Sequence, residues 1–335
     1  MLFVLALLSA LLSALLIVVL KPLLVRYALA RPNARSSHRV PTPQGGGIAV
    51  VGASLLVTGL AVLLFPGLDG PAAESFLVAA AAGLVLAAVG ATDDIRPLPT
   101  IPRLLLQIGA VTAVVLTSDM RLLPGLVPLS LERALLVFGG VWFVNLVNFM
   151  DGLDWITVAE MVPVTGFVAL CGWAGLMPLP AAYAAALCGA LIGFAPFNRP
   201  VARLFLGDVG SLPIGLLVGW LLLHLAGTGA LAAALLLPLY YLMDATLTLL
   251  RRLARRERVW EAHRTHFYQK ATDNGFSALA VSAHVFGLNL ALAGLAAVTL
   301  VWPSLAVQVA ALAVGLVLVG LVLRRFSRPH PEVTR

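Results

Sequence analysis

The chain has 335 residues, of which 61% are hydrophobic and only 11% are charged, and its formal net charge is +7. A soluble protein carries about a quarter of its residues as charged side chains, so the composition excludes an ordinary soluble domain. The basic residues lie beside long apolar runs, which favours membrane topology over nucleic-acid binding, and the two cysteines, Cys171 and Cys188, indicate neither a disulfide framework nor a metal site.

Apolar runs long enough to span a bilayer recur along the whole chain. They predict an all-α, polytopic membrane protein with a single integral-membrane domain over residues 1–335. About eleven transmembrane helices are expected, at residues 1–20, 46–65, 74–92, 101–118, 131–149, 155–176, 181–196, 209–227, 230–250, 278–301 and 303–323. The first run lacks a basic leading segment and a small-residue cleavage site, so we expect a retained helix rather than a signal peptide.

With eleven helices the termini lie on opposite sides, and the loops divide into two sets. One set comprises about 21–45, 93–103, 149–155, 197–208, 251–277 and the tail from Arg324, and it holds 20 of the 22 Lys and Arg residues. Only Arg121 and Arg133 fall in the other set. Because basic residues accumulate in cytoplasmic loops, this bias predicts that the first set is cytoplasmic, with a periplasmic N-terminus and a cytoplasmic C-terminus.

The polar motifs all lie in the predicted cytoplasmic set. The first loop, residues 31–47, is basic, is stiffened by proline and ends in Gly45-Gly46-Gly47 at the start of a helix. Glycine amides at a helix start can cradle phosphate. The Lys-Ser/Thr ending of a P-loop is missing, and a flexible hinge is the alternative interpretation.

Asp93 and Asp94 end the third predicted helix. Adjacent carboxylates at a membrane interface repel each other, which favours a cation between them. A metal ion, or a metal bound to a polyphosphate, would supply that cation, and one carboxylate could instead act as a general base. The alternative is an acidic helix end exposed to water.

The end of the fifth predicted helix reads Asn145-Leu-Val-Asn148-Phe-Met-Asp151-Gly-Leu-Asp154. The spacing of three predicts that these four polar side chains share one helix face. Amide and carboxylate oxygens suit Mg²⁺ and the hydroxyl groups of a sugar or ribose. Hydrogen bonding between helices would explain one Asn but not four polar residues in register.

At the start of the eighth predicted helix, Gly207-Asp208-Val-Gly210-Ser211 allows a backbone or a ligand to approach closely. Asp208 with Ser211 is a candidate for the cap of this helix. Asp208 is equally a candidate for bridging to a phosphate through Mg²⁺ at the helix N-terminus.

The basic loop before the tenth predicted helix contains His263-Arg264-Thr-His266-Phe-Tyr-Gln-Lys270. No cysteine lies nearby to complete a zinc site. Histidines beside Arg264 and Lys270 favour a diphosphate ligand. The five arginines between residues 251 and 258 are interpreted as an anchor against anionic lipid.

In combination these motifs resemble the polyprenyl-phosphate N-acetylhexosamine-1-phosphate transferases, or glycosyltransferase family 4. The resemblance covers nearly the whole chain and rests on Ser-Ser-His-x-x-Pro-Thr-Pro-x-Gly-Gly-Gly, Asp-Asp, Asn-x-x-Asn-x-x-Asp-Gly, Gly-Asp-Val-Gly-Ser and the His-containing loop, in the family's order. It implies a multi-pass enzyme of the bacterial inner membrane whose active site faces the cytoplasm. The implied reaction is attack of undecaprenyl phosphate on a UDP-N-acetylhexosamine, which forms an undecaprenyl diphosphate sugar and releases UMP.

The resemblance also implies roles for individual residues. The implied catalytic residues are Asp93, Asp94, Asp151 and Asp208, with Asp208 and Asp151 as ligands of Mg²⁺ or of Mn²⁺ in its place. The implied substrate-binding residues are Asn145, Asn148, Asp154, His38, Gly46, Gly47, His263, Arg264 and His266. Direct attack by the lipid phosphate and a covalent aspartyl intermediate are the two mechanisms discussed for the family. We favour direct attack, because a phosphate needs mainly positioning and charge neutralisation.

The His-Arg-Thr-His loop looks more like the O-antigen-initiating branch than the peptidoglycan branch. The expected pathway is therefore lipopolysaccharide or a related envelope glycan, with peptidoglycan or teichoic-acid precursors as the alternative. Trp155 follows Asp154 where the family usually has glycine, which argues against Asp154 as a carried-over ligand. The expected partners are the two substrates and membrane lipids but not nucleic acid. The sugar and the oligomeric state, a homodimer included, stay open.

A secondary transporter is the alternative from another class, with Glu160 and Asp244 along its substrate path. However, the polar motifs gather on one face rather than at the midplane, and the sequence shows no internal repeat. We therefore expect these two acids to form buried bonds between helices. A structural scaffold would give no reason for five polar motifs on one face.

Overall fold

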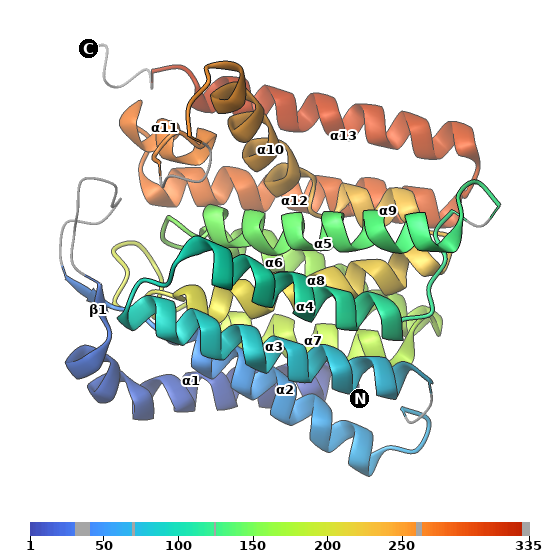
Figure 1. Ribbon diagram of the computed structural model, residues 1–335, viewed down its shortest axis with the longest axis horizontal. Coiled ribbons are helices and arrows are strands. Elements are labelled where there is room, and N and C mark those ends of the chain that lie inside the picture. Colours follow the sequence, from blue (N-terminus) through green and yellow to red (C-terminus); the bar gives the residue numbers. More distant parts are fainter. Residues whose placement is uncertain (31–40, 69–70, 124, 259–262, 330–335) are drawn as a thin grey trace.

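The computed structural model describes residues 1–30, 41–68, 71–123, 125–258 and 263–329, and these residues form a helical bundle with one short two-stranded ribbon (Figure 1). The elements are α1 (Leu2–Tyr27), β1 (Leu29–Ala30), β2 (Thr42–Pro43), α2 (Gly46–Leu64), α3 (Pro71–Ile95), α4 (Thr100–Thr117), α5 (Leu129–Met150), α6 (Ile156–Cys171), η1 (Gly172–Ala174), α7 (Pro178–Phe194), α8 (Asp208–Gly227), α9 (Leu231–Leu236), α10 (Leu239–Ala254), α11 (Phe267–Asp273), α12 (Ala278–Val301) and α13 (Leu305–Phe326). The strands β1 and β2 pair antiparallel.

Nine stretches of helix among the described residues are long and apolar enough to cross a membrane, and α7, with 17 residues, is a shorter tenth candidate. Because a bilayer offers no hydrogen-bond partners, a chain this apolar satisfies its backbone groups inside helices. The protein is an all-α polytopic membrane protein with nine or ten candidate spans. The predicted spans agree with these helices to within a few residues at most ends, with one exception.

The exception is the predicted span 230–250, which the structure divides into α9 and α10 around Leu237 and Pro238. Proline has no backbone N–H to donate into a helix, and its ring clashes with the preceding turn. The resulting α10 has 16 residues and carries Arg251 and Arg252 in its last turn. Among the described residues the predicted eleven uninterrupted helices are therefore reduced to ten.

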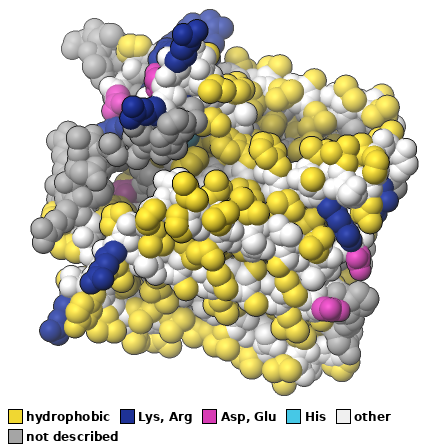
Figure 2. All heavy atoms as spheres, viewed as in Figure 1, with side chains coloured by type: hydrophobic (Ala, Val, Ile, Leu, Met, Phe, Trp, Pro, Cys, Tyr) yellow, Lys and Arg dark blue, Asp and Glu magenta, His cyan; other side chains and the backbone are white. Residues whose placement is uncertain are grey.

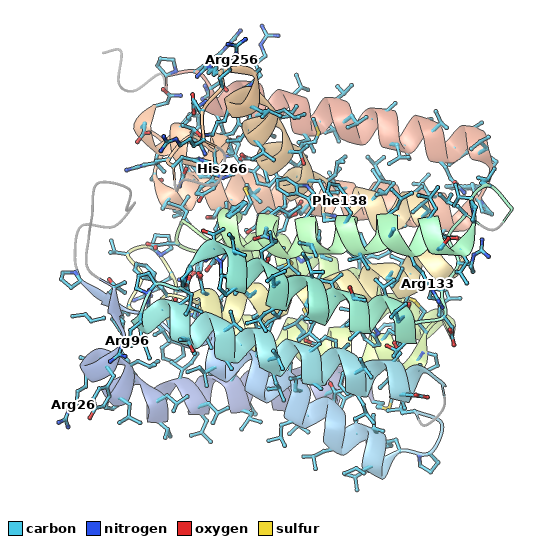
Figure 3. The ribbon with its side chains drawn as sticks, in the orientation of Figure 1. Arg26, Arg96, Arg133, Phe138, Arg256 and His266 are labelled. Carbon is cyan, nitrogen blue, oxygen red and sulfur yellow. The ribbon has the colours of Figure 1, made fainter. Side chains whose placement is uncertain are left out.

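Charged side chains gather at the two ends of the bundle, on either side of a broad apolar face (Figure 2). Figure 3 labels Arg26, Arg96 and Arg256 at one end and Arg133 at the other. The end with Arg26, Arg96 and Arg256, where α1 and α13 finish, is named the basic end here. It contains the loops that the sequence predicted to be cytoplasmic, and the side of the membrane that it faces stays a prediction.

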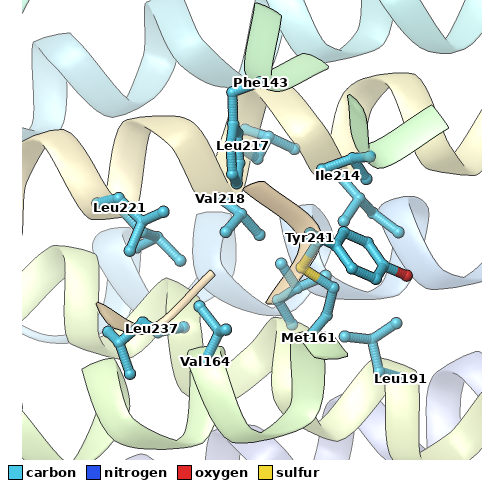
Figure 4. Packing of buried hydrophobic residues seen from close by; sticks show 14 of the residues in the cluster. Phe143, Met161, Val164, Leu191, Ile214, Leu217, Val218, Leu221, Leu237 and Tyr241 are labelled. Carbon is cyan, nitrogen blue, oxygen red and sulfur yellow. The ribbon is translucent and has the colours of Figure 1, made fainter. Parts of the chain in front are cut away.

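Helix α8 lies at the centre of the bundle, since 89% of its most apolar 18-residue stretch is buried. Its side chains Leu217, Val218 and Leu221 are fully buried, and they pack in one cluster with Phe143 of α5 and Val164 of α6 (Figure 4). A helix that is apolar all round is expected in such a central position. Helices α2, α3 and α5 pack against α8, and the start of α2, the end of α3 and the end of α5 lie beside its N-terminus.

Two glycines bring those helix ends close together. A Cβ on Gly90 of α3 would lie 2.2 Å from the carbonyl oxygen of Asp208, and a Cβ on Gly47 of α2 would lie 2.1 Å from the Cα of Gly210. Real Cβ atoms do not approach other atoms so closely, so only glycine fits at both positions. This close packing places Asp93 and Asp94, one turn beyond Gly90, beside the first residue of α8.

Candidate active site

Asp94 caps the N-terminus of α8 from a neighbouring helix. Its two carboxylate oxygens accept the backbone N–H groups of Asp208 and Val209 at 3.0 and 3.1 Å. The N-cap position itself is Gly207, with φ of 78°, and no side chain of the α8 segment caps the helix. The predicted capping role of Asp208 is therefore wrong, since a carboxylate 114 positions earlier in the chain satisfies the free N–H groups.

Asp93 is held by a cation that the sequence analysis did not single out. Its carboxylate accepts the backbone N–H of Leu98 at 2.6 Å and a guanidinium N–H of Arg103 at 2.8 Å. The same Arg103 nitrogen lies 3.7 Å from the carboxylate of Asp208. Arg103 thus lies between two of the predicted catalytic carboxylates and offsets part of their repulsion. The available signal was a basic residue in the first turn of the helix that follows the Asp-Asp pair.

Asn148 joins α5 to the start of α8. Its amide group donates to Asp208 Oδ1 at 2.8 Å and to Ser211 Oγ at 2.9 Å. Asn145, one turn away, instead donates to Gln107 Oε1 at 2.7 Å and to the carbonyl of Val141. The structure brings Asn148 to Asp208 and directs the amide of Asn145 to α4.

The predicted single face of four polar residues does not form, because α5 ends at Met150. Asp151 is the C-cap residue and accepts a hydrogen bond from the hydroxyl of Thr157. Asp154 lies farther along the turn, where its carboxylate accepts the backbone N–H of Ala202 at 2.9 Å. Asp151 and Asp154 are therefore brought to the site by a turn rather than by a helix face.

Trp155 ties the same turn to the loop before α8. It has a left-handed backbone with φ of 65°, a conformation that glycine adopts without strain. Its indole N–H donates to the carbonyl of Ala195 at 2.6 Å, and its backbone N–H donates to Asn198 Oδ1 at 2.8 Å. At this position, where the family usually has glycine, the two hydrogen bonds of Trp155 hold the turn in place.

A polar cavity of about 230 Å³ lies near the basic end, and Asp93 and Arg103 lie outside its lining. Its acidic lining residues are Asp94, Asp151, Asp154 and Asp208, and its amide-bearing lining residues are Gln44, Asn148, Asn198 and Gln269. Asp151 is half-buried in this group. Burial raises its pKa to about 8, the hydrogen bond from Thr157 opposes the rise, and the carboxylates of Asp208 and Asp94 add to it. A cation is expected to be attracted strongly to such a cluster.

The glycine run before α2 does not leave its amides available for phosphate. The backbone N–H groups of Gly46 and Gly47 donate to the carbonyls of Phe205 and Leu206, both at 2.9 Å. Close packing also requires glycine at both positions, and the phosphate cradle at Gly46 and Gly47 stays a prediction. His38, also predicted to bind substrate, lies outside the described residues.

The histidine loop lies beside the cavity rather than in its lining. His266 is buried, and its Nδ1 lies 3.2 Å from the carboxylate of Asp244. Burial lowers the pKa of His263 to about 4, so its ring is neutral at pH 7. Arg264 forms an ion pair with Asp273 at 2.9 Å. Of this segment, Gln269 reaches the cavity lining.

The donor set fits a hard divalent cation such as Mg²⁺. The cavity offers carboxylate and amide oxygens, which Mg²⁺ and Mn²⁺ accept. Within the described part of the chain, no group of three His, Cys, Asp or Glu side chains surrounds a single point. The ion would therefore be held by one or two carboxylates, for which Asp208 and Asp151 are the predicted ligands, and by substrate phosphates and water. Mg²⁺ is often bound in this way.

Most of the residues that line this cavity lie in a segment that resembles a known family. Residues 75–226 match the family model described as "Glycosyl transferase family 4". That range contains Asp93, Arg103, Asn148, Asp151 and Asp208, and it excludes the histidine loop.

Three curated relatives illustrate the similarity. A decaprenyl-phosphate N-acetylglucosaminephosphotransferase of Mycobacterium tuberculosis is 32% identical over 214 residues, which cover 57% of this chain and 52% of the relative. A phospho-N-acetylmuramoyl-pentapeptide-transferase of Staphylococcus haemolyticus is 29% identical, over 64% of this chain and 74% of the relative. A probable undecaprenyl-phosphate N-acetylglucosaminyl 1-phosphate transferase of Bacillus subtilis is 24% identical, over 79% and 76%. The chain thus spans about half the length of the mycobacterial relatives that it matches.

Proposed function

Starting from the match of residues 75–226 to glycosyl transferase family 4, we propose that this protein transfers an N-acetylhexosamine-1-phosphate from a UDP-sugar to undecaprenyl phosphate and releases UMP. The observation that carries the proposal is the cavity in which Asp94, Asp151 and Asp208 meet. Carboxylates from three helix ends line one cavity at one end of a membrane bundle, where one or two of them would hold a cation. A lipid phosphate and a water-soluble nucleotide can meet only at such an end.

The proposal includes the location of the site. The basic end, with its Lys and Arg side chains, would face the cytoplasm of a bacterium, because basic loops are retained on that side. The whole chain would act as one integral-membrane domain with a periplasmic N-terminus. Its isoprenoid substrate would then stay in the bilayer while the nucleotide enters from the cytoplasm.

The proposed reaction joins two anionic groups, so charge neutralisation is the main task of the site. Mg²⁺ bound at Asp208 and Asp151 would neutralise the diphosphate of the donor. Arg103, 2.8 Å from Asp93, would exchange that contact for a substrate phosphate. Asn148 would keep Asp208 oriented through their 2.8 Å hydrogen bond.

In the favoured mechanism, an oxygen of undecaprenyl phosphate attacks the phosphorus that carries the sugar. The bond between that phosphorus and the oxygen bridging to the uridine phosphate breaks, and UMP leaves with the electron pair. A proton need not be removed from the nucleophile, because a phosphate already carries negative charge. Direct attack therefore asks only for alignment and neutralisation, and Asp93 would assist in positioning the lipid phosphate.

The donor sugar is the finer part of the proposal. We favour a UDP-N-acetylated hexosamine used to start O-antigen or a related envelope glycan, because of the His-Arg-Thr-His loop. The similarity to a phospho-N-acetylmuramoyl-pentapeptide-transferase supports a second candidate, in which the same transfer begins a peptidoglycan precursor. The two candidates differ in the donor and not in the reaction.

The test is a donor panel with purified protein, undecaprenyl phosphate and MgCl₂. UDP-N-acetylglucosamine, UDP-N-acetylgalactosamine, a UDP-6-deoxy-N-acetylhexosamine and UDP-N-acetylmuramoyl-pentapeptide would be supplied separately, and both UMP and lipid-linked sugar would be measured. Formation of both products from one donor is expected. Absence of both products with every donor would exclude the proposed function.

Asp208→Asn is expected to lower turnover by about 100-fold or more, since one charged contact to the transferring group is lost. Asn keeps the shape of the side chain but not its charge. The matched control is Asp119→Asn, which alters an exposed carboxylate near Arg133 at the opposite end of the bundle. Full turnover of Asp208→Asn in the same assay would contradict the metal-site assignment.

A further inference from the structure

Asp244 is a fully buried carboxylate of α10, a helix that contributes no side chain to the lining of the polar cavity. Its Oδ1 accepts the backbone N–H of Phe267 at 3.0 Å and lies 3.2 Å from His266 Nδ1. Its Oδ2 accepts the backbone N–H of Tyr268 at 3.1 Å and the hydroxyl of Tyr240 at 3.2 Å. A buried carboxylate requires such hydrogen bonds. Three of these partners are consecutive residues, 266–268, so the contacts of Asp244 concentrate on the start of α11.

The same short segment touches the cavity from its other side. The hydroxyl of Tyr268 donates to the carbonyl of Phe149 at 3.1 Å, and a Cβ on Gly152 would lie 2.1 Å from that hydroxyl. Phe149 and Gly152 flank Asp151 along the chain. The next residue of α11, Gln269, belongs to the cavity lining. The start of α11 is therefore held between Asp244 and the turn that carries Asp151.

The contact between Asp244 and His266 also affects the orientation of the second histidine, His263. The ring of His266 stacks on that of His263, with centroids 4.9 Å apart at 27°, and on Tyr268 at 5.7 Å and 23°. The contact between Asp244 and Nδ1 thus fixes the orientation of the His266 ring.

We propose that Asp244 is a positioning residue, which fixes His266, and through its ring His263, together with Tyr268 against the Asn148–Gly152 turn. The effect on enzyme kinetics that we expect from replacing Asp244 rests on the proposed transfer reaction. The expected loosening of the start of α11 does not. Outer partners that orient site residues commonly affect activity by about 10- to 100-fold when they are removed.

Glu160 provides a matched control, because it is the other fully buried acid of this region. Its carboxylate accepts from Asn289 Nδ2 at 2.6 Å and lies 3.4 Å from the backbone N–H of Tyr241. Neither contact involves α11. Replacing this acid therefore tests what the loss of a buried carboxylate does by itself.

The first experiment compares amide hydrogen exchange of peptides covering residues 263–273 in the wild type, Asp244→Asn and Glu160→Gln. Asn offers one acceptor oxygen and an NH₂ group, so at least one of the N–H groups of Phe267 and Tyr268 loses its acceptor. Exchange of this segment is expected to rise about 10-fold or more in Asp244→Asn, as local opening becomes easier, and to stay unchanged in Glu160→Gln. Unchanged exchange in a folded Asp244→Asn would overturn the proposal.

The second experiment measures the KM of each substrate and the turnover number. Asp244→Asn is expected to raise the donor KM about 10-fold with the KM for undecaprenyl phosphate unchanged. Adding His266→Ala to Asp244→Asn is expected to have little further effect, because both changes break one contact. Fully additive effects of the two substitutions would overturn the proposed route through His266. If the wild type transferred no sugar, the exchange experiment would still decide whether Asp244 holds the loop.

Should Asp244→Asn fail to fold, Tyr268→Phe tests the same arrangement from the opposite side. It keeps the ring and removes only the hydroxyl bond to Phe149. Faster exchange of residues 263–273 would support the arrangement, and wild-type exchange would overturn it.

Discussion

Asp151 shows how one side chain connects the electrostatics of the cavity to the stability of the fold. Burial raises its pKa to about 8, while an aspartate in an unfolded chain ionises at about pH 4. Between about pH 4 and about pH 8 the unfolded chain loses this proton while the folded protein keeps it. Without a cation, the free energy of unfolding therefore falls as the pH rises through this range. A bound divalent cation would reverse that penalty, because it binds the ionised carboxylate.

We therefore predict that Mg²⁺ stabilises the protein more at pH 8.5 than at pH 6. The measurement is Tm in detergent by intrinsic fluorescence, with 5 mM MgCl₂ or with EDTA, at each pH. In Asp151→Asn the difference between the two pH values is expected to shrink, since one of the carboxylates that titrate in this range is gone. An Mg²⁺-induced change in Tm that is equal at both pH values in the wild type would contradict the prediction.

The sequence predicts the residue types of the site better than it predicts their contacts. The types at Asp94, Asn148 and Asp208 follow from motifs that are visible in the chain. Their contacts do not, because a cap such as Asp94 on α8 depends on which helix ends meet. The role of Arg103 could not be predicted either, because a lone arginine near a membrane span is usually a topology signal.

At the scale of the elements, the meeting of α3 with α8 determines the geometry of the site. Gly90 allows the end of α3 to lie directly against the backbone of Asp208. Most helix boundaries were predictable, since a bilayer forces apolar runs into hydrogen-bonded helices. The break at Pro238 was not predicted, and Asp151 and Asp154 were predicted on a helix face although α5 ends at Met150. In both places a backbone preference overrides a continuous polar or apolar pattern.

Gly90→Ala is predicted to destabilise the protein by about 1–3 kcal/mol, the usual cost of overpacking, and to abolish most turnover. The added methyl group would meet backbone atoms of Asp208 and Val209 at 2.2–2.5 Å, which cannot rotate away. Gly109→Ala in α4 is the control, because nothing lies within 4 Å of its added Cβ. Equal Tm values and equal turnover for the two variants would refute the role given to Gly90.

At the scale of the whole molecule, charge asymmetry connects the bundle to its orientation. Arg26, Arg96 and Arg256 lie at one end and Arg133 at the other (Figure 3). The asymmetry was visible in the sequence because each loop lies near a span. Which helices pack against α8 was not visible, since all of the spans are similarly apolar.

The proposed orientation predicts opposite labelling of two single-cysteine variants, made after Cys171 and Cys188 are replaced by Ala. Leu126→Cys, at a position that is 78% exposed, is expected to react with a membrane-impermeant maleimide in intact spheroplasts. Ser327→Cys, just after α13 at the basic end, is expected to react only after lysis. Labelling of Ser327→Cys from outside would reverse the proposed orientation.

The cap that Asp94 places on α8 affects how a genetic screen of this protein should be interpreted. A saturation library scored by growth would mark positions 90, 94 and 210 as intolerant, alongside 208. Gly90 and Gly210 admit neighbouring backbone, so their loss would deplete folded protein. Loss of Asp94 would remove both the acceptor of the first N–H groups of α8 and a carboxylate of the cavity. Fitness divided by membrane abundance would separate the two groups. Substitutions that confer resistance to a small molecule bound in the cavity would then be expected mainly at positions outside both groups.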